Sequence, residues 1–169
     1  LTRFTRNPFC QNRRVGRVKN GVLLEQYVYE SQTRIIAVLD AAGTLKQRFL
    51  YGRHSHSPDV MLTLNGNYRI ITTMNGTVRT VRNENGTPVQ VLSLNESGLI
   101  YSNSKPGFQP FGFAGGLADP DTGLVHFGAR EYDPETTRWM TKDPIGFGGG
   151  DTNLYGYVMN DPLNLIDPD

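Results

Sequence analysis

The sequence predicts an all-β fold made of short antiparallel strands joined by tight turns. The Asn-Gly dipeptide favours two-residue hairpin turns because both residues tolerate a positive φ. It occurs four times, at 20–21, 65–66, 75–76 and 85–86. Glycine and proline supply 19 and 10 of the 169 residues, which is typical of a chain with many turns. No segment shows the 3.6-residue apolar period of an amphipathic helix.

The segments between these turns are rich in the β-branched and aromatic residues that strands prefer. Tyr27 and Tyr29 are two residues apart, as are Phe49 and Tyr51. This spacing places each pair on one face of its strand, because side chains alternate between the two faces of a sheet. We therefore expect strands at 25–29, 34–39, 45–51, 68–74, 77–82 and 87–94.

The sequence also shows a repeat that is longer than the spacing of single strands and turns. Gly21 and Gly43 lie 22 residues apart, and so do Tyr29 and Tyr51. A repeat of two strands and a turn at this spacing fits a stacked or spiralling sheet. It fits an ordinary antiparallel meander equally well, and the spacing alone leaves both interpretations open.

The composition excludes several classes of protein. The formal net charge is +1, so there is no basic excess that would indicate a nucleic-acid partner or a membrane surface. The single cysteine cannot form an internal disulfide, and no apolar run approaches the ~18 residues of a membrane span. Because the chain starts at Leu1 rather than methionine, we expect a fragment or a processed product.

The amino-acid composition of the chain changes at about Gly98. From there the chain is dense in glycine, aromatic residues and Asp-Pro pairs, whose aspartates are Asp119, Asp133, Asp143, Asp161 and Asp167. Each pair is a turn signal, because aspartate bonds to nearby backbone and proline restricts φ. So many turns leave little room for strands long enough to build a core, and we expect this part to be irregular.

The last 70 residues resemble the core domain that closes Rhs and YD-repeat proteins. The motifs that carry the resemblance are PFGFAGG (110–116), DPDTGLVHFGAREYDPETTRW (119–139), KDPIGFGGGDTNLYGYVMNDP (142–162) and LIDPD (165–169). Residues 25–97 look like degenerate YD repeats. The resemblance implies two parts: repeat strands of a shell wall at 1–97, and an autoprotease core domain at 98–169.

In this family a YD-repeat sheet spirals into a hollow shell around a polymorphic C-terminal toxin. The resemblance implies that the core domain cuts its own chain once, by an aspartyl-protease-like mechanism, after an Asp-Pro-x-Gly-Leu motif. Asp167, Pro168 and Asp169 would be the first residues of that motif. The implied partners are the rest of the shell, the enclosed toxin and a secretion-system spike or adaptor chaperone. The implied location is the bacterial cytoplasm before export or delivery to a target cell, and no cofactor or metal is implied.

The resemblance points to Asp143 as the principal acid/base residue and to Arg130 as the group that orients a carboxylate or stabilises charge on the scissile carbonyl. The second carboxylate is implied less closely: Glu131 and Asp133 are the first candidates. Asp161 and Asp167 are further candidates. Each residue also has a structural alternative, because Arg130 could form a salt bridge and the aspartates could serve their turns.

Two other interpretations remain open in the sequence. The same Tyr-rich strands would suit a non-catalytic structural wall or one that interacts with carbohydrate. His54, His56 and Asp59 fall within six residues of one another and could suggest a metal site, although no third histidine or cysteine is near. We therefore expect an exposed loop at this position.

Overall fold

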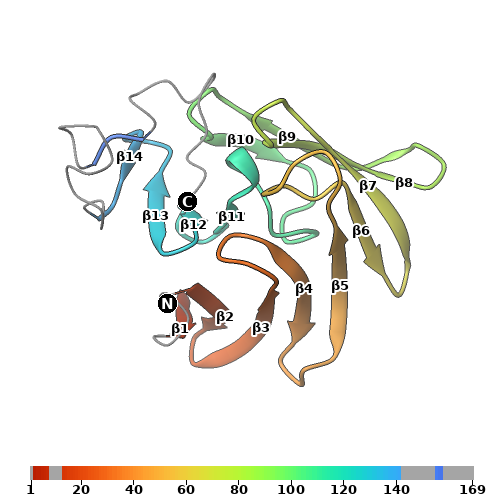
Figure 1. The fold of residues 1–169 in the computed structure, drawn as a ribbon, viewed down its shortest axis with the longest axis horizontal. Helices are drawn as coiled ribbons and strands as arrows, with labels where there is room; N and C mark the ends of the chain where they lie inside the picture. The colour runs from red at the N-terminus through yellow and green to blue at the C-terminus, as the bar shows by residue number, and fades with distance from the viewer. Residues whose placement is uncertain (1, 8–12, 142–154, 158–169) are drawn as a thin grey trace.

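The computed structural model describes residues 2–7, 13–141 and 155–157, which form two antiparallel sheets. The larger one, here called the large sheet, has its described strands in sequence order, each paired with the next. It curves into an open arc (Figure 1), so it is a bent antiparallel meander. Its strands are β1 (Thr2–Asn7), β2 (Arg13–Lys19), β3 (Val22–Tyr29), β4 (Ile35–Asp40), β5 (Leu45–Leu50), β6 (Val60–Thr63), β7 (Gly66–Thr72), β8 (Val78–Asn83), β9 (Pro88–Leu94) and β10 (Ile100–Asn103).

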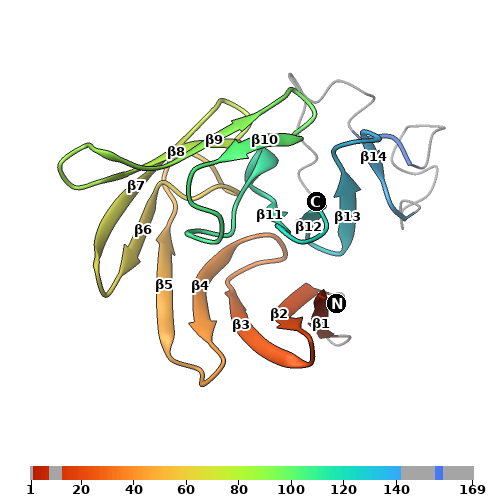
Figure 2. The same ribbon diagram turned by 180° about the vertical axis from the view of Figure 1, so that it is seen from behind.

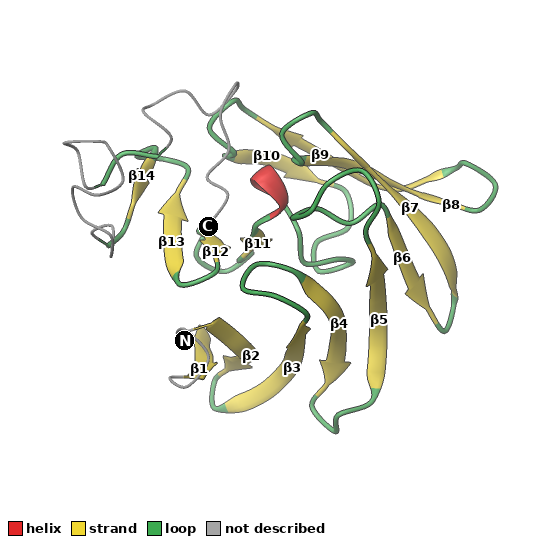
Figure 3. Ribbon diagram, in the orientation of Figure 1, coloured by secondary structure: helices red, strands yellow, loops and turns green. Residues whose placement is uncertain are grey.

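The second sheet, here called the small sheet, lies within the opening of the arc, as the two opposite views agree (Figures 1 and 2). It follows a 3-10 turn, η1 (Phe113–Gly115), the one helical segment in the described residues (Figure 3). Its strands are β11 (Leu117–Ala118), β12 (Val125–Phe127), β13 (Arg130–Asp133) and β14 (Arg138–Trp139).

All six strands that the sequence predicts are present, as β3, β4, β5, β7, β8 and β9. The turns between them are mostly of a different type from the one expected. Among the Asn-Gly pairs only Asn20 and Gly21 both have a positive φ, of 52° and 82°. At the other three pairs only the glycine does, so the expectation of type I′ turns is wrong there.

A longer loop of one form occurs at four hairpins, and at two of them, 75–76 and 85–86, it replaces the turn expected from an Asn-Gly pair. At 40–44, 73–77, 83–87 and 95–99 the loop ends in a glycine with positive φ, the usual form of a three-residue hairpin loop. The side chain of the first residue accepts the backbone N–H of the residue four positions later, at 2.8–3.1 Å. These capping residues are Asp40, Thr73, Asn83 and Asn95. Their side chains bond to the far end of the loop and so favour it over the shorter turn.

The large sheet buries one face, to which each strand from β3 to β9 contributes a fully buried apolar side chain. Residues 106–118 cover this face: Phe111 and Leu117 belong to the same core, and the rings of Phe49 and Phe111 meet edge to face at 4.8 Å. The seven strand residues are Tyr27, Val38, Phe49, Met61, Ile70, Val81 and Leu92. We call this the core face, and the opposite one the free face.

The 22-residue spacing of Tyr29 and Tyr51 corresponds to one repeated contact. The Tyr29 hydroxyl donates to the backbone carbonyl of Arg14 at 2.8 Å, and that of Tyr51 donates to the carbonyl of Ile35 at 2.6 Å. A guanidinium lies over each ring, from Arg13 and Arg34 respectively. Burial raises the pKa of both tyrosines, so the hydroxyls stay protonated and act as donors.

The small sheet has its own aromatic core. The rings of Tyr132 and Tyr157 lie 4.7 Å apart, and those of Trp139 and Tyr157 lie 5.2 Å apart. Phe113 and Phe127 complete the cluster. The expectation that the turns leave too little strand to form a core is therefore wrong in this region. Large rings bury enough apolar area for strands of two to four residues to suffice.

Replacing Gly98 by alanine should destabilise the junction between the two sheets. Gly98 has a φ of +92°, and an added Cβ would overlap the Phe113 side chain. We expect Gly98→Ala to lower the local opening free energy by about 3 kcal/mol, from left-handed strain plus overpacking. Native-state hydrogen exchange of the amides around residues 95–118 measures it.

Gly86→Ala is the matched control, because Gly86 has a φ of +81° and open space around the position of a Cβ. Gly86→Ala should lower the local opening free energy by about 1 kcal/mol, because it introduces only the backbone strain. Equal losses in the two variants would show that the contact with Phe113 does not matter.

Candidate functional site

Strand β13 presents Arg130 and Glu131 on opposite faces of the small sheet. It is the second-last strand, paired with β12 on one side and β14 on the other. In this register Arg130 lies opposite Phe127, and Glu131 lies opposite the buried His126. Neighbouring side chains in a strand point to opposite faces. Arg130 is therefore directed to the aromatic core, and Glu131 is directed away from it.

Arg130 is 8% exposed, and its guanidinium lies over the Trp139 ring at 4.1 Å from the ring centroid. This distance is well within the range of a cation–π interaction, which is strengthened when water is excluded. The side chain therefore keeps a positive charge in a largely dry environment. A guanidinium in such a place interacts strongly with any carboxylate or oxyanion that comes within reach.

Glu131 forms an ion pair with Arg14 of β2, with an N–O distance of 3.0 Å. The Arg14 side chain is only 2% exposed and that of Glu131 is 22% exposed. The basic residues between Arg3 and Lys19 would suit a solvated surface if judged from the sequence alone, but Arg14 among them is buried. The ion pair joins β13 to the large sheet. Its two residues are far apart in the sequence, so no local sequence pattern could predict the contact.

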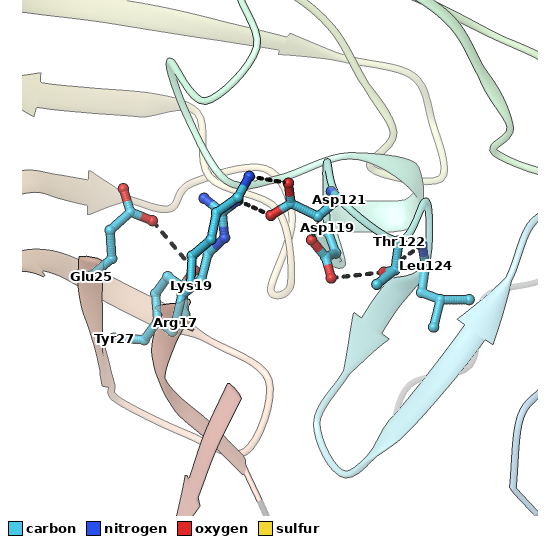
Figure 4. A network of polar contacts seen from close by, with 8 residues as sticks. All are labelled: Arg17, Lys19, Glu25, Tyr27, Asp119, Asp121, Thr122 and Leu124. Atoms are coloured by element: carbon cyan, nitrogen blue, oxygen red, sulfur yellow. Dashed lines mark hydrogen bonds and ion pairs between the residues drawn. The ribbon is translucent and has the colours of Figure 1, made fainter. Parts of the chain in front are cut away.

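A second ionic link runs from the large sheet to the loop between β11 and β12 (Figure 4). Asp121 accepts hydrogen bonds from Arg17 at 2.5 Å and from Lys19 at 2.6 Å. Asp119 is buried and shapes the loop, because its carboxylate accepts the Asp121 N–H and the Thr122 hydroxyl. Both links therefore connect β2 with the small sheet or its loops.

A cavity of about 300 Å³ lies between the two sheets beside these links. Its lining includes Arg17 and Tyr27 from the large sheet and Phe111 and Asp119 from the segment that covers the core face. Burial raises the pKa of Tyr27, so its hydroxyl stays protonated. The walls combine apolar and charged groups, which is the usual character of a binding pocket in a protein.

Asp133 has the contacts of a turn-forming residue. Its carboxylate accepts the backbone N–H of Glu135 at 2.9 Å and the hydroxyl of Thr136 at 2.8 Å. These contacts close the turn between β13 and β14. The other predicted site residues, namely Asp143, Asp161, Asp167, Pro168 and Asp169, lie outside the described residues.

The loop that contains His54 and His56 is held by its own hydrogen bonds. Asp59 accepts the N–H groups of Gly52 and Arg53 and pairs with the Arg53 guanidinium at 2.7 Å. Burial lowers the pKa of His56, which is half-buried and contacts the carbonyl of Asn75. The histidines are less exposed than the sequence suggests. In the part of the chain that the structure describes, no three His, Cys, Asp or Glu residues cluster as a metal site would require.

None of the helical structure in the described segments is both long and apolar enough to cross a membrane.

The sequence profile of the Teneurin YD-shell family matches residues 10–163. Teneurin-3 of Danio rerio is 44% identical over 75 residues, which are 41% of this chain and 3% of that protein. The toxin protein Tse5 of Pseudomonas aeruginosa is 42% identical over 64 residues, 38% of this chain and 5% of that protein. The double-stranded DNA deaminase toxin A of Burkholderia cenocepacia is 47% identical over 60 residues, 36% of this chain and 4% of that protein.

Solved structures share the fold over almost the whole chain. A crystal structure of TcdB2-TccC3-Cdc42 has a TM-score of 0.67 at 17% identity, and one of TcdB2-TccC3-TEV has a TM-score of 0.62 at 18% identity. Each covers 99% of this chain, which corresponds to 10% of the other. The chain thus spans only a small part of the proteins that it matches. With a profile match over most of its length, the chain belongs to the Teneurin YD-shell family and is a shell protein of the Rhs/YD-repeat type.

Proposed function

We propose that this chain closes a shell that encloses a C-terminal toxin, and that it takes part in a single cut of its own polypeptide. Two of its relatives are named as toxins, Tse5 and the double-stranded DNA deaminase toxin A. The other partners would be the rest of the shell and a secretion-system spike or adaptor chaperone. The protein would be made in the bacterial cytoplasm and then exported or delivered to a target cell.

One observation carries the proposal of a cut: the buried Arg130 and the neighbouring Glu131 on β13. Arg130 keeps its charge against Trp139, and Glu131 is held in place by Arg14. A positive group and a carboxylate are two of the three groups that acid–base cleavage of a peptide requires. Because these two side chains point to opposite faces of β13, the scissile bond would have to meet them at the start of the strand, beside the turn from β12. Asp143 would supply the third group.

The proposed reaction is the hydrolysis of one peptide bond after an Asp-Pro-x-Gly-Leu motif that begins at Asp167, Pro168 and Asp169. One carboxylate takes a proton from water, and the water oxygen attacks the scissile carbonyl carbon. Arg130 stabilises the negative charge that develops on the carbonyl oxygen. A protonated carboxyl group then donates its proton to the leaving nitrogen as the C–N bond breaks, which yields a new carboxyl and a new amino terminus.

The contacts of the two candidates for the second carboxylate favour Glu131. The Asp133 carboxylate already serves its own turn. Glu131 is partly exposed at 22%, so water and a passing chain can reach it. We therefore assign the second carboxylate to Glu131 and a structural role to Asp133.

Asp143→Asn should abolish the cut and leave the protein folded. Asparagine retains the size of aspartate and its ability to form turns, but it cannot transfer a proton, so we expect the rate to fall by at least about 10²-fold. Mass spectrometry of the intact protein reports whether and where the chain is cut. Full processing of the variant would remove Asp143 from the mechanism.

The same variant tests whether the cut is intramolecular. A bond held beside its catalytic groups reacts at a high effective concentration, so the native protein should be cut at a rate independent of its concentration. Asp143→Asn mixed with native protein should stay intact. If the variant were cut faster as more native protein is added, the reaction would be that of an ordinary protease.

Arg130→Lys should slow the cut by about 10²-fold, because an ammonium does not reproduce the planar guanidinium that stacks on a ring and binds an oxyanion in two places. The control is Arg138→Lys, at an exposed position on β14. Both rates are followed by gel electrophoresis. If Arg130→Ala were cut normally, the residue would be structural and the site assignment wrong.

The two carboxylates of β13 should respond differently to removal of their charge. We expect Glu131→Gln to slow the cut strongly, and Asp133→Asn to be cut at close to the native rate, because asparagine can still accept the Glu135 N–H. Hydrogen exchange in β13 and β14 shows whether either variant loosens the strand. A strong loss of cutting in Asp133→Asn with unchanged exchange would reverse the assignment.

A further inference from the structure

The free face of the large sheet carries an unusual distribution of charge. Strands β5 to β10 contain no aspartate or glutamate. Three of their arginines, Arg48, Arg69 and Arg82, are exposed. They alternate along their strands with the buried core residues Phe49, Ile70 and Val81, so all three lie on the free face.

Register brings two of these arginines into direct opposition. Arg69 of β7 is the Cα partner of Arg82 of β8, and on its other side Arg69 faces Val60 of β6. Val60 in turn faces Leu50 of β5. One row across four strands therefore reads Leu, Val, Arg, Arg, and the neighbouring row pairs Arg48 with Leu62.

This arrangement is unfavourable for the isolated sheet. Like charges directly opposite one another on a sheet destabilise it, whereas opposite charges at the same positions stabilise it. Six other cations of the described chain form ion pairs with carboxylates, and none of the three free-face arginines takes part in those ion pairs. Arg82 donates one hydrogen bond to the backbone carbonyl of Gly86, which leaves its charge without a carboxylate in those pairs. The paired cations are Arg14, Arg17, Lys19, Arg34, Lys46 and Arg53.

We propose that this row of the free face is a docking surface for a partner protein that presents carboxylates beside an apolar patch. A partner with two carboxylates about 5–7 Å apart would match neighbouring strands and would remove the repulsion between Arg69 and Arg82. The proposal does not depend on self-cleavage, since the free face lies opposite the face that packs on residues 106–118.

The chemistry of the row favours a protein over a polysaccharide or a lipid surface. Guanidinium groups bind carboxylates through two parallel hydrogen bonds, and arginine is enriched at protein interfaces while lysine is depleted. The row places two aliphatic side chains beside its two arginines, and the aliphatic Leu50 is 42% exposed. Of the four strands in the row, β6 to β8 contain no lysine, and the one lysine of β5, Lys46, is paired with Glu25. A surface for polyanions alone would not need the aliphatic residues.

The test uses the intact protein and a fluorescent cyclic β-hairpin peptide, one face of which carries two cross-strand glutamates and two valines. Arg69→Gln/Arg82→Gln should bind this peptide about tenfold more weakly than the native protein, as the loss of two ion pairs predicts. A peptide with glutamines in place of the glutamates should bind the native protein equally weakly. Arg138→Gln, an exposed arginine of β14, is the matched control and should bind like the native protein.

Three results would overturn the proposal. They are no binding of the glutamate peptide to the native protein, equal binding of the two peptides, and tighter arginine-dependent binding to heparin or to phosphatidylglycerol vesicles than to the peptide. Hydrogen exchange supplies an independent readout. Arg69→Gln should slow exchange of the β7 and β8 amides several-fold, because it relieves the repulsion with Arg82, and faster exchange would contradict the role assigned to this pair.

Discussion

The large sheet cannot bury its core face on itself, because it is an open arc whose strands β3 to β9 direct buried apolar side chains to its interior. Residues 106–118 meet that need by adding Phe111 and Leu117 to the core that these strands line. The edge-to-face contact of Phe49 with Phe111 marks the centre of this packing. The described strands that follow depend on this segment for their position, since β11 begins at Leu117 and the other strands of the small sheet pair outward from it.

Apolar packing and ion pairs have different roles in joining the two sheets. The shared core supplies most of the favourable free energy, as burial of large apolar side chains generally does. The ion pairs from β2 to Glu131 and Asp121 fix the orientation of the small sheet relative to the large sheet, because each requires a guanidinium or ammonium group to meet a carboxylate. Such pairs contribute little net stability, but an unmatched buried charge is costly, so they disfavour other arrangements of the small sheet.

The strands between residues 22 and 94 could be predicted because their signals are local. Glycine ends the loops, and β-branched or aromatic residues fill the strands between them. Strand β6 was missed because only four residues separate Asp59 from the next turn. Strand β2 was missed because Arg13, Arg14 and Arg17 obscure its alternation, and the carboxylate partners of Arg14 and Arg17 lie about a hundred positions away. The same reason explains why Arg130 could be named from its motif while its contact with Trp139, and the partner of Glu131, could not.

The ionic link between Arg17 and Asp121 joins positions 104 residues apart in the chain, and this separation has a consequence for the order of events during synthesis. The ribosome releases β2 long before Asp121, and closing so large a loop costs entropy that only a nearly complete fold can offset. Arg17 and Asp121 therefore come together last, after the strands between them have formed. This ion pair can form only when all the intervening strands are present and in register, because a missing or misregistered strand would place Asp121 away from Arg17.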